Sequence, residues 1–133
     1  MLTVENIMTK NVTSINHSTL ISEVEGLFVT HNISGAPIVD NLNQLVGFVS
    51  KSDITRFDSL GEDSSYARVS EIANPNVITI PSTATLENAA QLMLKKHTHH
   101  LVVIDNYKIV GVLSSLDFVM LIAKNFNKMK KTL

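Results

Sequence analysis

Two segments of this chain, Gly47–Asp53 (GFVSKSD) and Gly111–Asp117 (GVLSSLD), share the pattern Gly-apolar-apolar-Ser-x-x-Asp. In each, an apolar run typical of a strand passes into a segment typical of a helix. Free backbone N–H groups and the positive end of the helix dipole favour an anion such as phosphate at this junction. The serine adds a donor, and the aspartate is suited to accept from ribose hydroxyls. The motif therefore indicates a site for a nucleoside phosphate.

A second interpretation needs no ligand. Ser50 or Ser52 would cap the helix that follows, and Asp53 would complement its dipole. The presence of both residue types at the same place in two segments favours a binding role, since capping residues vary freely. Both interpretations stay open at this point.

The two motifs belong to an internal repeat of most of the chain. Residue 4 aligns with residue 69, and the offset drops by one after the turns at 40–41 and 105–106. The identical pairs include Val4/Val69, Ile7/Ile72, Asn11/Asn76, Ile15/Ile80, Leu27/Leu92, Asp40/Asp105, Gly47/Gly111, Ser50/Ser114 and Asp53/Asp117. The repeat predicts four regions: repeat 1 over 1–57, a polar linker over 58–67, repeat 2 over 68–123 and a basic tail over 124–133.

Both copies show the same order of predicted elements. A helical turn (4–8; 69–73) precedes a short strand (12–15; 77–80) and an amphipathic helix, which Thr85 caps in copy two and Ser18 or Thr19 in copy one. Two strands follow (36–40 and 45–50; 101–105 and 108–114), and then a second helix. The fold class is therefore α/β (α+β), with two β-α-β-β-α halves that we expect to pack about a pseudo-twofold axis.

The composition excludes several classes of protein. Lys and Arg number 11 against 12 Asp and Glu, and the net charge of −1 gives no general attraction for nucleic acid or membranes. Cysteine is absent, which excludes disulfide frameworks, thiol nucleophiles and Cys-ligated metals. The longest apolar run, 118–123, is too short to span a bilayer, and no signal peptide is visible. We expect a cytoplasmic protein.

The repeat, its order of elements and four sequence segments together resemble a tandem pair of CBS domains, also called a Bateman module. The segments are Ile7–Thr9, Ser34–Asp40, His100–Asp105 and the two Ser-x-x-Asp endings. The resemblance implies clefts between the repeats that bind adenosine-containing ligands such as AMP, ADP, ATP or S-adenosylmethionine. It also implies a homodimer, because paired CBS modules commonly dimerise.

The resemblance carries the family's binding residues over to this sequence. It implies that Asp53 and Asp117 hold the ribose and that Ser50 and Ser114 lie near the phosphate. The residues that would surround the base and phosphates are Thr13, Ser14, Ile15, Gly35, Ala36 and Pro37 in copy one, and Ile78, Thr79, Ile80, His99, His100 and Leu101 in copy two. The copies differ where Val102 replaces Pro37, so we expect the two sites to be occupied unequally.

The histidine cluster His97–His100 allows three interpretations. A metal site is disfavoured because His99 and His100, as neighbours in a strand, point to opposite faces. In the family, this stretch often carries basic side chains directed at ligand phosphates. The resemblance therefore implies this role for His99 or His100, together with Lys51. In that case the affinity for polyphosphates weakens as the imidazoles lose their protons near neutral pH. The third interpretation is a loop with incidental histidines.

These observations favour a stand-alone CBS-pair regulator that binds an adenosyl ligand and signals to an unidentified protein partner. Neither a P-loop nor a catalytic triad is visible, so we expect no enzyme activity, no catalytic cofactor and no metal. The apolar helix segment 118–123 favours a homodimer, since no polar face is left on it. We expect neither nucleic acid nor membrane as a partner of the basic tail. The alternative functions are a dimerisation or scaffold module without a ligand and a metal-dependent protein.

Overall fold

The computed structural model describes residues 2–126, and these form two compact units. The middle unit contains residues 13–77. The terminal unit contains the described residues of 1–12 and 78–133. Each unit therefore has its own core and is considered separately below.

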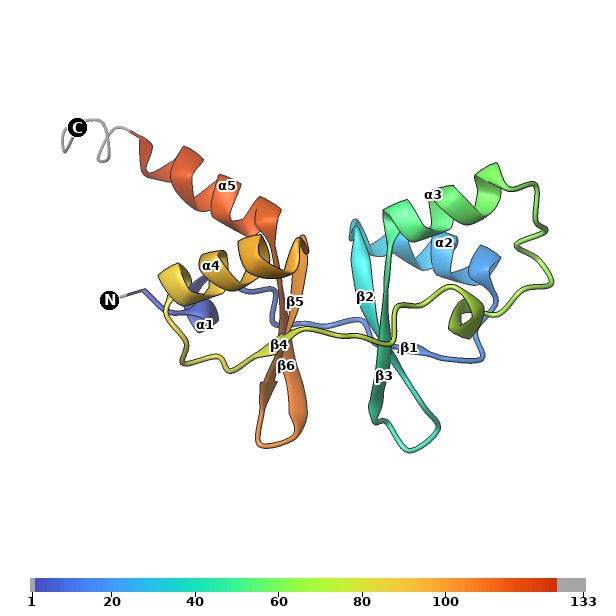
Figure 1. Cartoon of the computed structure of the whole chain (residues 1–133), viewed down its shortest axis with the longest axis horizontal. Coiled ribbons are helices and arrows are strands. Elements are labelled where there is room, and N and C mark those ends of the chain that lie inside the picture. Colours follow the sequence, from blue (N-terminus) through green and yellow to red (C-terminus); the bar gives the residue numbers. More distant parts are fainter. Residues whose placement is uncertain (1, 127–133) are drawn as a thin grey trace. The chain divides into compact units, whose positions relative to one another are not determined.

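The middle unit is a three-stranded sheet covered by two helices. Its elements are β1 (Ile15–Asn16), α2 (Ile21–His31), β2 (Gly35–Val39), β3 (Leu45–Ser50), α3 (Lys51–Ser59) and a 3-10 turn, η1 (Val69–Glu71). The strand order is β1-β2-β3, with β1 parallel to β2 and β2 antiparallel to β3. Apolar residues of α2, α3 and all three strands form one buried cluster, which places both helices on the same face of the sheet (Figure 1).

The terminal unit repeats this arrangement. It contains α1 (Val4–Ile7), β4 (Thr79–Ile80), α4 (Leu86–Lys96), β5 (His100–Asp105), β6 (Lys108–Ser114) and α5 (Ser115–Lys124). The strand order is β4-β5-β6, again with one parallel and one antiparallel pair. The α/β fold class and the repeated order of elements are thus confirmed.

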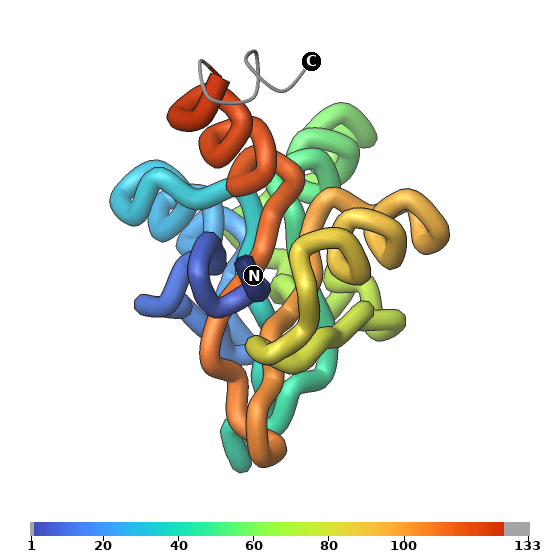
Figure 2. The backbone as a smooth tube through the Cα atoms, turned by 90° about the vertical axis from the view of Figure 1, so that its left-hand side faces the viewer, coloured from blue at the N-terminus to red at the C-terminus, as the bar shows by residue number. Residues whose placement is uncertain are grey.

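Each sequence repeat begins with a short helical segment, α1 in repeat 1 and η1 in repeat 2, which we call its leader. Each leader packs in the unit that is built mainly from the other repeat. Val4 is fully buried among residues of β4, α4, β5 and β6, whereas Val69 is fully buried in the cluster of the middle unit. Thr9 forms a bridge to Val112 of β6, where Figure 2 shows the N-terminal segment beside that strand. The compact units and the sequence repeats therefore divide the chain differently, and the repeat boundaries remain a prediction.

The first strand of each unit is shorter than the sequence suggests. We expected 12–15 and 77–80, and the structure has Ile15–Asn16 and Thr79–Ile80. In the terminal unit, the Val102 amide donates to the carbonyl of Ile78 at 3.0 Å, before β4 begins. The corresponding residue of the middle unit is Pro37, which has no N–H to donate. The proline therefore removes one backbone hydrogen bond from the parallel pair of the middle unit, although both first strands contain only two residues.

One predicted helix cap is confirmed and another is wrong. The Thr85 hydroxyl accepts from the amide of Asn88 at 3.1 Å, as expected for the cap of α4. In contrast, α2 is preceded by Leu20, and neither Ser18 nor Thr19 caps it. Carbonyls of the linker take this role: the amide of Ile21 donates to the carbonyl of Ala67 at 2.9 Å. A tertiary contact thus satisfies the helix end.

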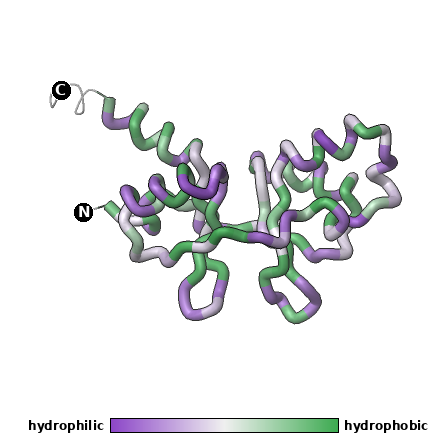
Figure 3. The backbone as a smooth tube through the Cα atoms, in the orientation of Figure 1, coloured by the Kyte–Doolittle hydropathy of each residue, from purple (hydrophilic) through white to green (hydrophobic). Residues whose placement is uncertain are grey.

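The predicted basic tail lies largely outside the described residues, which end at Phe126. Within residues 2–126, no helix is both long and apolar enough to cross a membrane. The last described helix, α5, is coloured mostly as hydrophobic in Figure 3, and none of its residues is buried.

Candidate functional site

The strand pairing of the middle unit brings its predicted site residues to one edge of the sheet. Gly35, the first residue of β2, pairs with Ser50, the last residue of β3. Because β1 runs parallel to β2 with Ile15 opposite Ile38, the residues that precede β1 run alongside the start of β2. The lead-in to β1, the start of β2 and the start of α3 therefore form one corner.

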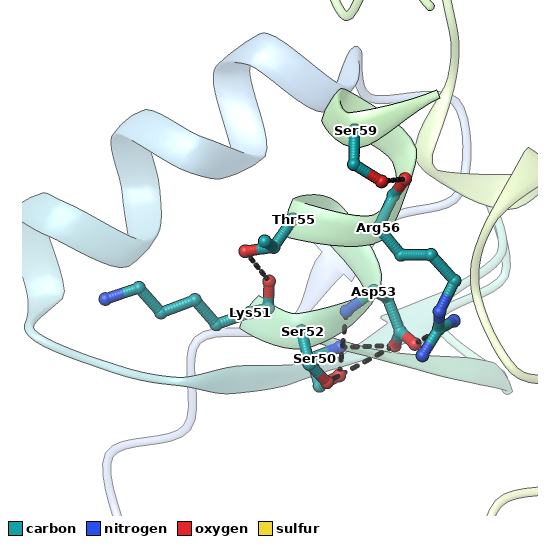
Figure 4. A network of polar contacts seen from close by, with 7 residues as sticks. All are labelled: Ser50, Lys51, Ser52, Asp53, Thr55, Arg56 and Ser59. Atoms are coloured by element: carbon teal, nitrogen blue, oxygen red, sulfur yellow. Dashed lines mark hydrogen bonds and ion pairs between the residues drawn. The ribbon is translucent and has the colours of Figure 1, made fainter. Parts of the chain in front are cut away.

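At this corner, Ser50 and Asp53 hold each other in place (Figure 4). The Ser50 amide donates to Asp53 Oδ2 at 2.8 Å, and the Ser50 hydroxyl contacts the same oxygen at 2.9 Å. Of the two serines that the capping interpretation offered, Ser50 caps α3, and its hydroxyl accepts from the Asp53 amide at 3.3 Å. Asp53 Oδ2 satisfies the first turn of α3, and Oδ1 points away from that contact toward Arg56.

The terminal unit builds the same corner from repeat 2. His100 pairs with Ser114, and the Ser114 amide donates to Asp117 Oδ2 at 2.8 Å. The amide of Ser115 donates to the carbonyl of His99 at 2.9 Å, as the amide of Lys51 donates to that of Ser34 at 2.8 Å. The backbone scaffold of the two corners is therefore the same, although their side chains differ.

The structure brings together the predicted residues of each repeat within one unit, but it leaves them unequally accessible. In the middle unit, Ala36 and Pro37 are fully buried and Ile15 nearly so, whereas Ser14 is exposed and Thr13 and Gly35 are partly exposed. A ligand at this corner would meet Ala36 and Ile15 through their backbone. Their side chains belong to the core.

The terminal unit shows the same division. Leu101 and Ile80 are buried, Ile78 is half-buried, and Thr79 is exposed. His99 is exposed, and its Nδ1 lies 3.4 Å from the Ser115 hydroxyl at the start of α5. Among residues 2–126, the structure contains no group of three His, Cys, Asp or Glu side chains that could hold a metal ion.

Comparison with known protein families shows which family contains this repeated unit. The model of the CBS domain matches the chain twice, over residues 4–59 and 69–124. The chain belongs to the CBS domain family. The matches end just after the two Ser-x-x-Asp corners, so each contains one complete corner.

Two solved CBS structures with ligands resemble this CBS pair. The CBS domain pair of protein MJ0100, solved with 5-methylthioadenosine and S-adenosyl-L-methionine, has a TM-score of 0.85 and 27% identity over 94% of this chain and 98% of that one. CBSX2 in complex with AMP has a TM-score of 0.76 and 27% identity, covering 93% of this chain and 98% of that one.

Curated relatives are mostly longer proteins. Protein MJ1232 of Methanocaldococcus jannaschii is 36% identical over 118 residues, which is 88% of this chain and 38% of that protein. Protein MJ1225 of the same organism matches 96% of this chain and 46% of its own length, at 29% identity. The chain thus spans less than half the length of these relatives.

Lys51 of the CBS pair does not point toward Asp53. Figure 4 shows its side chain extending away from Ser50 and Asp53. It lines a hollow of about 380 Å³ between α2 and α3, together with Glu25 and Asp58 and the apolar side chains Phe28, Val29, Ile33 and Ile54. A phosphate role for Lys51 at the corner therefore needs another rotamer and stays a prediction.

Glu25 is an ionisable residue of this hollow with a partly buried carboxylate. Its Oε1 is buried and has no hydrogen-bond partner. Burial, and after it the nearby negative charge of Asp58, raises the pKa of Glu25 above its usual value of 4.5. Because the folded state then binds the proton more tightly than the unfolded chain, this group favours folding at low pH. Its contribution is lost as the pH rises through the raised pKa.

We therefore expect Glu25→Gln to be more stable than the wild type at pH 7, because it removes the carboxylate that burial and Asp58 disfavour. The difference in melting temperature shrinks as the pH falls below about 4.5, where the wild-type group is neutral in both states. Thermal unfolding followed by circular dichroism from pH 4 to pH 8 measures this. Glu23→Gln, at an exposed position of the same helix, is the matched control. Equal gains in both variants would contradict the prediction.

Sequence reasoning missed one residue of the first corner, Arg56. Its Nη1 lies 3.4 Å from Asp53 Oδ1, so the two side chains form an ion pair. Two features of the sequence could have identified Arg56. Its spacing of three from Asp53 places both residues on one helix face, and its charge is a difference between the repeats, because repeat 2 has Met120 at the aligned position.

Proposed function

We propose that this CBS pair is a regulatory module that binds an adenosine-containing small molecule at its Ser-x-x-Asp corners and signals to a partner protein. The ligand is AMP, ADP, ATP, S-adenosylmethionine or a close relative. In this proposal Asp53 and Asp117 accept from the ribose hydroxyls, and the helix starts at Ser50 and Ser114 face the phosphate or its replacement.

The observation that carries the proposal is the geometry of the two aspartates. In both corners Oδ2 is used by the backbone amide of the serine, which fixes the orientation of the carboxylate without using its second oxygen. The other oxygen has no backbone donor and, in the middle unit, faces the exposed side chain of Arg56; such a carboxylate is suited to hydroxyl donors. Support also comes from the MJ0100 pair and CBSX2, two similar folds that hold adenosyl ligands.

Thermal stability in the presence of ligands tests the proposal. A ligand that binds only the folded chain raises the melting temperature in proportion to the logarithm of its concentration over Kd. We expect such a rise with at least one of AMP, ADP, ATP, 5-methylthioadenosine and S-adenosylmethionine, and a smaller one with guanosine monophosphate. A melting temperature that none of the five compounds changes at millimolar concentration would reject the proposal.

A homodimer is the second part of the proposal, and the exposure of α5 supports it. Leu116, Val119, Met120 and Ile122 of α5 are each about half-exposed or more, and Phe126 beyond it is 59% exposed. A run of exposed apolar side chains along one helix is costly in water and typical of an interaction surface. A second copy of the chain would cover it.

We expect Val119→Lys to weaken the dimer at least tenfold, because a lysine in an apolar interface loses its hydration without gaining a partner. Sedimentation velocity across a concentration series measures the dissociation constant. The control is Leu42→Lys, which changes an exposed leucine in the β2–β3 turn and leaves α5 untouched. A monomeric wild type, or a Val119→Lys dimer as strong as the control, would contradict this.

A further inference from the structure

Arg56 lies beside the candidate ribose acceptor of the middle unit and is held there loosely. Its Nη1 is 3.4 Å from Asp53 Oδ1, a long distance for a charged hydrogen bond, and 70% of its side chain is exposed. An exposed ion pair of this kind contributes little to stability. The guanidinium can therefore leave Asp53 at small cost.

The two oxygens of Asp53 have separate partners. Oδ2 accepts from the amide and hydroxyl of Ser50, whereas Oδ1 faces only Arg56 among the recorded contacts of residues 2–126. Ribose hydroxyls that approach Oδ1 take the place of Arg56. The displaced guanidinium stays at the same corner, because its helix position is one turn beyond Asp53 (Figure 4).

In the terminal unit, the position that corresponds to Arg56 has no basic residue. Asp117 makes the same bond to the Ser114 amide, but the residue three positions later is Met120. The next basic residue of α5 is Lys124, two turns beyond Asp117. Two histidines also lie at this corner: His99, just before β5, contacts the Ser115 hydroxyl at the start of α5, and His100 pairs with Ser114. The carboxylate of Asp117 therefore has no lysine or arginine within one helical turn of it on α5.

We infer that Arg56 makes the middle-unit site selective for adenosine ligands that carry a phosphate, whereas the terminal-unit site favours adenosyl ligands without negative charge. The inference rests on the proposed function. A phosphate on the 5′ carbon is repelled by the aspartate that holds the ribose, and a guanidinium offsets this by pairing with two phosphate oxygens. Where methionine replaces the arginine, a neutral thioether or a cationic sulfonium meets no such penalty.

The experiment measures the affinity ratio of AMP to 5-methylthioadenosine by isothermal titration calorimetry, one site at a time. Asp117→Asn weakens the terminal-unit site, so the tighter binding event reports the middle unit. In this background we expect AMP to bind more tightly than 5-methylthioadenosine. Arg56→Met lowers the ratio about tenfold or more, and Arg56→Lys lowers it less. In the reverse background, Asp53→Asn, we expect Met120→Arg to raise the ratio.

The outcomes separate the inference from the function beneath it. An unchanged ratio in Arg56→Met overturns the inference while the proposed function stands, because the ligands still bind. A wild-type chain that binds neither compound overturns the proposed function, and the inference with it. Arg56 is mostly exposed, so its variants test binding rather than folding.

Discussion

Asp53→Asn and Asp117→Asn each lower the affinity of their own site for adenosyl ligands by about ten- to a hundredfold. This is the range that the loss of a hydrogen bond to a charged group costs, about 1.5–3 kcal/mol. Asparagine is the informative replacement because its carbonyl still accepts from the serine amide that caps the helix. Alanine would remove this bond and mix a folding effect with a binding effect. Calorimetric titration with AMP and with 5-methylthioadenosine measures both variants.

The control for these variants is Asp63→Asn, which removes a carboxylate from the exposed linker and leaves both corners intact. We expect its affinities to equal those of the wild type. The double variant Asp53→Asn/Asp117→Asn should lose both sites. Wild-type affinity in the double variant would show that these aspartates only cap their helices.

Gly111→Ala has the largest expected effect on stability, a loss of about 1–3 kcal/mol in the free energy of unfolding. A Cβ on Gly111 would collide with the side chain of Met8 and lie 3.1 Å from the carbonyl oxygen of Thr9. That carbonyl accepts from the amide of Val112, so it cannot move away without losing the bridge that holds the N-terminal segment against β6. Urea unfolding of the full chain measures the loss.

Gly26→Ala is the matched control because it makes the same chemical change in open space. Gly26 lies within α2, and a Cβ there would have no atom within 4 Å. We expect this variant to gain about 0.5–1 kcal/mol, since alanine loses less backbone entropy than glycine in a helix. If both variants change stability in the same direction, the proposed collision at Gly111 is wrong.

The strands and helices could be predicted closely because their signals are local. The paired strands at 45–50 and 108–114, the helices after Ser50 and Ser114 and the Thr85 cap follow from apolar periodicity and capping chemistry. The cap of α2 could not be predicted. Its partners, the carbonyls of Ser64 and Ala67, come from a linker that is distant in the sequence, and a carbonyl has no signature in the residue type.

The residues of the candidate site could be predicted from the sequence, but the directions of their side chains could not. The repeat identified Asp53 and Asp117, and the strand pairing places each beside the other predicted residues of its repeat. Rotamers are set by neighbours, so the sequence did not reveal that the Lys51 side chain extends away from Asp53 and lines the hollow between α2 and α3. Nor did it reveal that Arg56 turns toward Asp53.

The sequence by itself determined that the chain is a duplicated β-α-β-β-α unit, because periodicity and turn chemistry repeat from one copy to the next. Only the tertiary structure decided which core each leader enters. Val4 and Val69 are identical residues in equivalent positions, and either would fill either cavity as far as size and hydrophobicity are concerned. The choice depends on the path of the connecting chain and on two glycines. Gly47 leaves room for the backbone of Asn74, and Gly111 leaves room for that of Thr9. These contacts join residues far apart in the sequence, so no local pattern predicts them.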